Sequence, residues 1–233
     1  MTTAELTLER PATTGEQVLT NAHIVTETET FVGTVRLKDS LIADLDSGRS
    51  QLPAARDCQG QYLIPGLVEL HTDNLEKHFS PRPGVIWPSA PAVITHDAHI
   101  VSSGITTVFD ALSVGDVATE STRVQHLQTL LDALAHTHGN NLLRAQHLLH
   151  LRCEVSHPDT LHLFRELVDH PMLQLVSVMD HTPGQRQFVN EDKYHEYYKG
   201  KYGMSTEEMA AFTRDRKESA RLHSERNRQA VVS

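Results

Sequence analysis

The sequence predicts an α/β fold in which a small N-terminal β-domain precedes a parallel sheet covered by helices. Two observations lead to this prediction. Residues 18–64 hold short runs of β-forming residues between Gly, Asn and Asp turn residues. After Pro65 the pattern changes to strand, loop and helix in repeated succession. Such alternation is typical of a (β/α)8 barrel or of a doubly wound sheet.

The first 64 residues divide into a tail and the small β-domain. Residues 1–17 are polar and show no periodicity, so we expect a loose tail. The runs VLTNAHIVT, TFVGTVRLKDSLIADLD and GQYLIP alternate or cluster β-formers and predict short strands. We expect this β-domain, residues 18–64, to be composite and to lack partner strands.

The sequence pattern of residues 65–233 predicts four strands and the helices that follow them. The strands are expected at 66–73, 105–112, 148–155 and 172–181, and the helices at 91–104, 120–136 and 159–170, with a last helix that opens at a Ser205/Glu208 capping box. Asp159 is the expected N-cap of the third helix. A complete barrel needs about 250 residues, and 168 residues follow Pro65. We therefore interpret 65–233 as the first half of a TIM-like barrel, with open sheet edges that favour self-association.

The composition and net charge of the chain argue against several classes of protein. The chain has 30 acidic and 21 basic residues, a net charge of -9, which argues against nucleic-acid and membrane binding. Two cysteines suit a reducing compartment. No signal peptide is evident at the start, and no apolar run approaches the ~20 residues that cross a bilayer. We expect a cytoplasmic enzyme.

The first strand after Pro65 carries a candidate metal pair. Alternate side chains of a strand share a face, so Glu69, His71 and Asp73 point the same way. At the C-terminal end of a barrel strand, where active sites lie, His71 and Asp73 would suit a divalent ion. A lone His-x-Asp also occurs by chance, so its position after a Pro-Gly-apolar strand is what favours the metal interpretation.

A wider set of motifs resembles a known family. The run PGLVELHTD at 65–73 is similar to the first-strand signature of the amidohydrolase superfamily, Pro-Gly-x-x-Asp-x-His-x-His, with departures at Glu69 and Asp73. With HTDNLEKH, PRPGV.WP, HDA at 96–98, SGITTV.DA at 103–111, HLRCE at 150–154 and DH.PGQRQ at 180–187, the chain resembles the alpha-D-ribose 1-methylphosphonate 5-triphosphate diphosphatases of the carbon–phosphorus lyase pathway. Asp73 is itself a feature of that family.

The resemblance implies a reaction and a metal site. It implies a metal-dependent hydrolase that converts a phosphorylated ribose phosphonate, a small molecule, to its 5-phosphate and pyrophosphate with one or two divalent ions, zinc or manganese. The implied ligands are His71, Asp73, Glu154 and His181. For Glu154 the alternative is an ion pair with Arg152 inside the barrel, and His181 is preferred over Asp180 because of its face of the strand.

Phosphate recognition needs fixed cations in the loops after the first and fourth strands. The candidates are Lys77, His78, Arg82 and Arg186. The Lys and Tyr residues of 193–202 are equally consistent with a solvated helix or loop. We expect a hydrogen-bonding role for Asp110, and packing or support of a ligand for His96 and Asp97.

Two other functions compete with this one. An amidase or cyclic-imide hydrolase of the same superfamily would need fewer cations. Alternatively, the chain is a catalytically silent portion or an assembly subunit. This holds if further metal ligands and the general base lie in residues that follow this N-terminal portion. A homo-oligomer is also possible.

Overall fold

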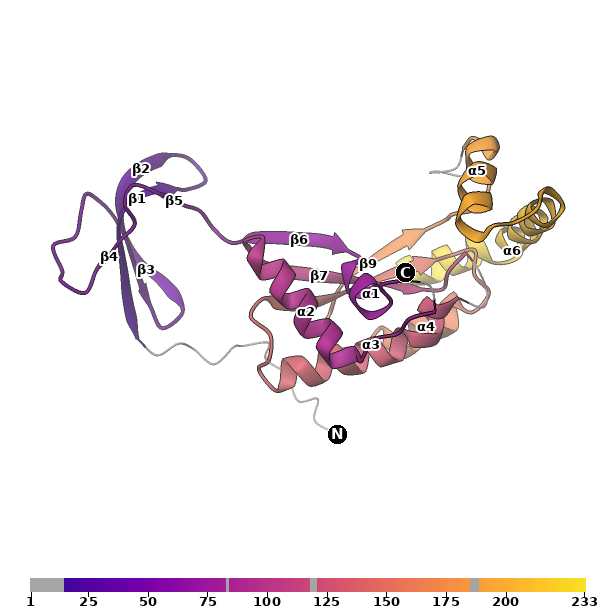
Figure 1. The fold of residues 1–233 in the computed structure, drawn as a ribbon, viewed down its shortest axis with the longest axis horizontal. Coiled ribbons are helices and arrows are strands. Elements are labelled where there is room, and N and C mark those ends of the chain that lie inside the picture. Colours follow the sequence, from indigo (N-terminus) through magenta and orange to yellow (C-terminus); the bar gives the residue numbers. More distant parts are fainter. Residues whose placement is uncertain (1–14, 83, 118–120, 185–188) are drawn as a thin grey trace. The chain divides into compact units, whose positions relative to one another are not determined.

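The computed structural model describes residues 15–233 apart from 83, 118–120 and 185–188. The chain divides into two compact units, residues 1–67 and 68–233. Figure 1 shows a β-sheet in the first unit and an α/β arrangement in the second.

The first unit is a sheet built around β1 (Glu16–Val25). Its other strands are β2 (Thr30–Lys38), β3 (Leu41–Ser47), β4 (Arg56–Asp57) and β5 (Tyr62–Leu63), in the order β3-β2-β1-β4, with β5 also on β1. β1 begins inside the segment expected to be a tail. The register shifts between Leu19 and Ala22, where Asn21 has a φ of 56°, and the amide of Asn21 donates a 2.7 Å hydrogen bond to Asp57. This bulge ties the short strand β4 to β1.

The second unit contains the four predicted strands in one sheet. They are β6 (Leu67–Thr72), β7 (Ile105–Val114), β8 (Gln146–Glu154) and β9 (Leu173–Met179), in the order β6-β7-β8-β9. β7, β8 and β9 pair in parallel, and Figure 1 shows β6 running in the direction of β7. The sequence interpretation of an α/β fold with the first half of a TIM-like barrel is confirmed.

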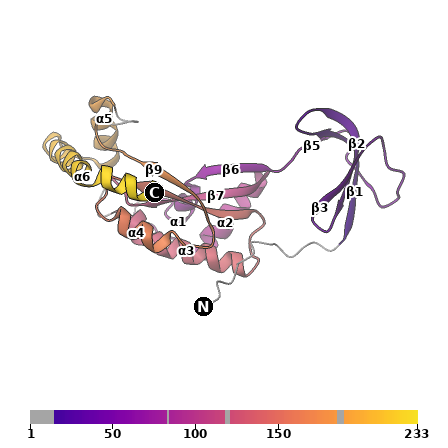
Figure 2. The same ribbon diagram turned by 180° about the vertical axis from the view of Figure 1, so that it is seen from behind.

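Helices follow the strands along the chain. They are α1 (Asn74–Phe79), α2 (Ser89–Ser102), α3 (Thr122–Gly139), α4 (Thr160–Leu167), α5 (Glu191–Tyr202) and α6 (Thr206–Val232). Both ribbon views show α2, α3 and α4 on one face of the sheet (Figures 1 and 2). The helices thus form the outer layer expected of a barrel.

The main core lies between β8 and these helices. Leu149, Leu151 and Cys153 point to the helix side, where four leucines of α3 cover them: Leu127, Leu130, Leu131 and Leu134. Each fully buried leucine contributes roughly 1.5–3 kcal/mol. Burial raises the pKa of Cys153 to about 12, so this residue packs as a neutral thiol.

Helix ends follow local sequence in part. Ser205 and Glu208 form the predicted capping box at the start of α6. Asp159 is the N-cap residue of α4, as expected, although its side chain makes no capping hydrogen bond. The structure also has helix α1 directly after the first barrel strand, where the sequence suggested a loop.

The first barrel strand is poorly covered. Leu67, Val68 and Leu70 of β6 are each about half exposed, at 49%, 57% and 56%.

In the part of the chain that the structure describes, no helix is both long and apolar enough to cross a membrane.

Candidate active site

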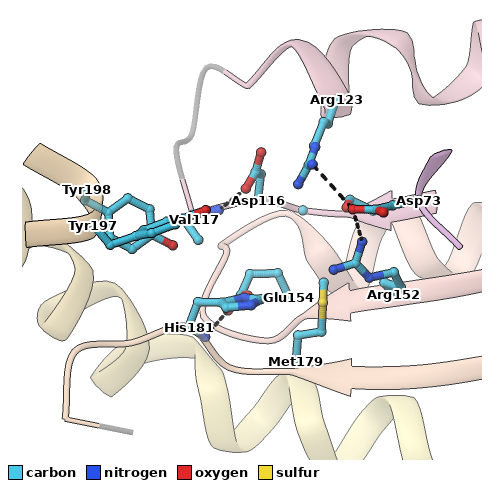
Figure 3. A pocket seen from close by; sticks show the side chains of 12 residues that line it. Asp73, Asp116, Val117, Arg123, Arg152, Glu154, Met179, His181, Tyr197 and Tyr198 are labelled. Atoms are coloured by element: carbon cyan, nitrogen blue, oxygen red, sulfur yellow. Dashed lines mark hydrogen bonds and ion pairs between the residues drawn. The ribbon is translucent and has the colours of Figure 1, made fainter. Parts of the chain in front are cut away.

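The carboxyl ends of the four barrel strands converge on one cavity. Asp73 directly follows β6, Ser113 lies near the end of β7, and Glu154 and Met179 end β8 and β9. The cavity holds about 270 Å³ and is completed by residues of the following loops and helices: Gly115, Asp116, Val117, Arg123, Arg152, His181, Tyr197 and Tyr198. Figure 3 shows most of these side chains directed toward the same space. This is the edge at which barrel enzymes place their active sites.

Asp73 is surrounded by three cations. Its carboxylate lies 3.7 Å from Lys77 Nζ, 3.7 Å from Arg152 Nη1 and 4.0 Å from Arg123 Nη2. Figure 3 shows the pairs with the two arginines. Arg123 also forms a closer ion pair, 2.8 Å from its Nε to Glu76. The distances around Asp73 are those of loose ion pairs, longer than a hydrogen bond.

Arg152 is the least satisfied of these cations. Its side chain is only 12% exposed, and its Nε and Nη1 atoms have no hydrogen-bond partner among the described residues. A buried guanidinium with unused donors is unfavourable unless an anion accepts from them. The cavity therefore contains hydrogen-bond donors that could bind the oxygen atoms of an anionic ligand.

Glu154 and His181 form a close pair on the other side of the cavity. Oε2 of the fully buried Glu154 lies 2.5 Å from Nδ1 of His181, and Oε1 accepts a 2.6 Å hydrogen bond from the Ser156 hydroxyl. Burial by itself raises the pKa of Glu154. The bonds from His181 and Ser156 outweigh burial and hold this pKa below its usual value. Glu154 is therefore an ionised carboxylate beside an imidazole.

Close packing fixes the loops at this edge. Gly115, just after β7, has a φ of +80°, and a Cβ there would lie 2.5 Å from the Thr160 hydroxyl oxygen. Only glycine fits this position. The loop after β8 is held by α6, because Asn227 donates to the carbonyls of Val155 and His157 and Ser219 donates to that of Ser156, at 2.6–3.1 Å.

The structure brings together three of the four predicted ligands in one cavity. Asp73, Glu154 and His181 line it, whereas His71 does not and instead packs edge-on against His150, with ring centroids 5.0 Å apart. No three of the four place ligand atoms within 4.8 Å of one another. Asp180 lies outside the cavity and bonds to Thr182 and Arg228.

Three of the predicted phosphate-binding residues are not part of the cavity lining, although Lys77 pairs with the cavity residue Asp73. Lys77 is exposed and bonds to Asn74, His78 packs near the rings of His96 and His99, and Arg82 is exposed. None of the three lines the cavity. Arg186 is outside the described residues.

The sequence reasoning missed the cavity cations. Arg152 was considered only as a partner of Glu154, yet its ion pair is with Asp73. Arg123 was not singled out. Its one sequence signal is its position in the first turn of the helix that follows the second barrel strand, since such βα segments face the site.

A second group of His and Asp residues is completely buried between α2 and the sheet. Asp110 bonds to His96 at 2.8 Å and to His147 at 2.7 Å, and His147 also lies 3.2 Å from Asp97. We call these four residues the buried cluster. Burial alone would lower the pKa of His147, but Asp110 and Asp97 raise it to about 9. Of the described residues, His96, Asp110 and His147 are the group whose geometry could hold a metal ion.

Comparison with known proteins agrees with this architecture. The chain is 43% identical over 216 residues to the alpha-D-ribose 1-methylphosphonate 5-triphosphate diphosphatase of Escherichia coli (strain K12). The match covers 93% of this chain and 57% of that relative, so the chain spans little more than half of the relative's length. No known family model matches the chain.

One solved structure shows a similar fold. A 5-methylcytosine deaminase from Klebsiella pneumoniae matches with a TM-score of 0.51 and 14% identity, over 87% of this chain and 64% of that one. A D-hydantoinase matches with a TM-score of 0.48 and 19% identity, over 79% and 37%. The chain is therefore similar in sequence to a diphosphatase of that name, over little more than half of that relative's length, and it shares its fold with the deaminase.

Proposed function

We propose that this protein hydrolyses the anhydride between the α- and β-phosphates of alpha-D-ribose 1-methylphosphonate 5-triphosphate in phosphonate catabolism. The products are pyrophosphate and alpha-D-ribose 1-methylphosphonate 5-phosphate. The observation that supports this most is the cavity itself, where the under-used Arg152 lies beside carboxylates and an imidazole. The 43% identity to a diphosphatase of that name agrees with it.

The cavity contains donor types that bind divalent metal ions. Two carboxylates and one imidazole, from Asp73, Glu154 and His181, are ligand types that zinc and manganese accept. We propose these residues as ligands, together with His71 at the end of β6. A divalent ion held there would lower the pKa of a bound water to about 7 and so supply hydroxide near neutral pH.

The two arginines would bind the polyphosphate. Arg152 approaches Asp73 only at 3.7 Å, so phosphate oxygens can accept from its unused donors without breaking a short hydrogen bond. Arg123 would keep its 2.8 Å ion pair to Glu76 through Nε and offer Nη2, which lies 4.0 Å from Asp73. Their position also resolves an electrostatic conflict. A chain with a net charge of -9 repels a polyanion unless cations are concentrated at the binding site.

Other residues would orient the substrate. Burial raises the pKa of Tyr198, which therefore keeps its proton and can donate a hydrogen bond within the cavity. The loop candidates Lys77, His78, Arg82 and Arg186 are proposed as contacts for the outer phosphates.

The test follows the phosphorus atoms. The 233-residue chain would be incubated with the ribose phosphonate triphosphate and zinc or manganese, and ³¹P NMR would record pyrophosphate and the 5-phosphate. Binding of pyrophosphate would be measured in parallel by calorimetry. Arg152→Ala should weaken that binding, whereas Arg165→Ala, a change at an exposed arginine of α4, should not.

The outcomes separate the competing functions. Release of pyrophosphate supports the proposal. Binding of pyrophosphate without hydrolysis identifies this chain as a catalytically silent portion of the enzyme. A chain that neither binds nor releases pyrophosphate, or that hydrolyses a cyclic imide instead, contradicts the proposal.

A further inference from the structure

The buried cluster lies far from the cavity although both involve β8. His147 is near the start of this strand and Glu154 ends it. Seven residues of strand span about 23 Å, and an odd separation places the two side chains on opposite faces. His147 accordingly faces the helix layer with Leu149 and Leu151, whereas Glu154 lines the cavity. The two groups cannot share one ion.

The geometry of the buried cluster is that of a ligand set with a supporting carboxylate. Nε2 of His96, the carboxylate of Asp110 and a ring nitrogen of His147 lie within 4.8 Å of one another. The other nitrogen of His147, Nε2, faces Asp97, which is fixed by hydrogen bonds from the backbone N–H groups of Arg144 and Ala145 at 2.8–3.0 Å. A carboxylate behind a ligating histidine is the usual arrangement around protein-bound zinc.

The ligand atoms need only a small movement to accept an ion. Asp110 lies 2.8 Å from His96 and 2.7 Å from His147. Ligand atoms about 2.0–2.2 Å from a tetrahedral ion lie roughly 3.3 Å apart. Each of these two His–Asp pairs would have to separate by only about half an ångström to share an ion.

Charge balance favours a divalent cation. Asp97 and Asp110 are 0% exposed, and among the described residues neither carboxylate has a Lys or Arg partner. Nδ1 of His96 is also buried and has no hydrogen-bond partner among the described residues. One divalent ion would balance the charge of the two buried carboxylates.

We propose that His96, Asp110 and His147 form a structural binding site for one divalent transition-metal ion, with zinc as the best match, and that Asp97 supports it through His147. Two imidazoles and one carboxylate are ligands of a borderline ion such as Zn²⁺. The site would fasten α2 to β7 and β8. This inference is independent of the proposed hydrolysis, because it concerns an ion that does not meet the cavity.

The experiment separates the two candidate metal sites in the full chain. Asp73→Asn with His181→Gln removes two of the cavity's ligand candidates. This double variant would be loaded with Zn²⁺, passed through a column with a mild chelator, and analysed for zinc per chain. His96→Gln and His136→Gln would each be added to it; His136 is an exposed histidine of α3 and serves as the matched control. Cobalt loading adds a visible spectrum of the ligand set.

The proposal expects about one zinc per chain in the double variant and with His136→Gln, and an affinity at least tenfold weaker with His96→Gln. It also expects added Zn²⁺ to raise the melting temperature of the double variant. If His96→Gln does not fold, Asp97→Asn in the same background should weaken zinc binding about 10–100-fold. A folded double variant that retains no zinc, or zinc retention unchanged by the His96 and Asp97 substitutions, would overturn the proposal and leave a metal-free hydrogen-bonded network.

Discussion

The cavity and the buried cluster use the same kinds of residue in opposite surroundings. In the cavity, the side chain of Asp73 is 35% exposed and is approached loosely by three cations. In the buried cluster, Asp110 is 0% exposed and has two short hydrogen bonds to histidines. The first carboxylate is available to a ligand, whereas the second is committed to its neighbours unless an ion enters between them.

This difference shows that burial, more than residue type, determines how much a group of His and Asp residues contributes to stability and whether it is available to a ligand. An exposed ion pair contributes about 0–1 kcal/mol, whereas removal of one partner from a buried pair costs about 3–5 kcal/mol. The two regions should therefore respond very differently to the same substitution.

The largest expected effect is a loss of stability at the buried cluster. Asp110→Ala should lower the free energy of unfolding by about 3–5 kcal/mol, because it leaves two buried histidines without their shared acceptor. Asp73→Ala should change the same quantity by less than about 1 kcal/mol. Urea denaturation of both variants measures the contrast. Equal losses would erase the distinction between the two regions.

The next effect concerns ligand binding in the cavity. Arg152→Ala should weaken pyrophosphate binding about tenfold to a hundredfold, since a hydrogen bond to a charged group contributes about 1.5–3 kcal/mol. Stability should remain nearly unchanged, because this arginine leaves donors unused in the free protein. Calorimetric titration provides the measurement, with Arg165→Ala as the control. Wild-type affinity in the Arg152 variant would show that the phosphates bind elsewhere.

A smaller effect distinguishes the two ends of β7. Gly115→Ala at the cavity end should lower stability by about 2 kcal/mol or more, because the left-handed backbone and the contact with Thr160 both oppose a Cβ. Gly104 precedes the strand at a similar φ of +79° but has open space around it, so Gly104→Ala should cost about 1 kcal/mol. Thermal and urea unfolding compare the pair. A larger loss at Gly104 would contradict the packing described for the cavity edge.

The smallest effect is at the start of α6. Ser205→Ala should cost about 1 kcal/mol, because it removes the side-chain cap that the N–H of Glu208 uses. Chemical denaturation should detect the loss, whereas Ser233→Ala at the far end should have no effect beyond experimental error.

Local patterns predicted the strands and the faces of β8 because both depend on neighbours along the chain. The alternation of Leu149, Leu151 and Cys153 with His150, Arg152 and Glu154 separated the helix side from the interior correctly. The capping box at Ser205 is equally local. Helix α1 was missed because its six residues are too short to show an apolar period.

Partners distant in sequence were the part that could not be predicted. Arg152 pairs with Asp73 across 79 residues, and His147 reaches Asp97 across 50, through strand order and helix docking that no short window contains. The roles expected of Asp110, His96 and Asp97 were near to what the structure shows. Their assembly around His147 was not foreseen.

The anchoring of the loop after β8 by α6 has a dynamic consequence. Asn227 and Ser219 satisfy three successive carbonyls of that loop, at Val155, Ser156 and His157. The loop cannot open toward water without first losing these bonds, so its motion is coupled to detachment of the helix. Amide hydrogen exchange in the loop and in α6 should therefore follow one shared opening event. The rate at which α6 detaches would then limit the rate at which the segment that positions Glu154 can move.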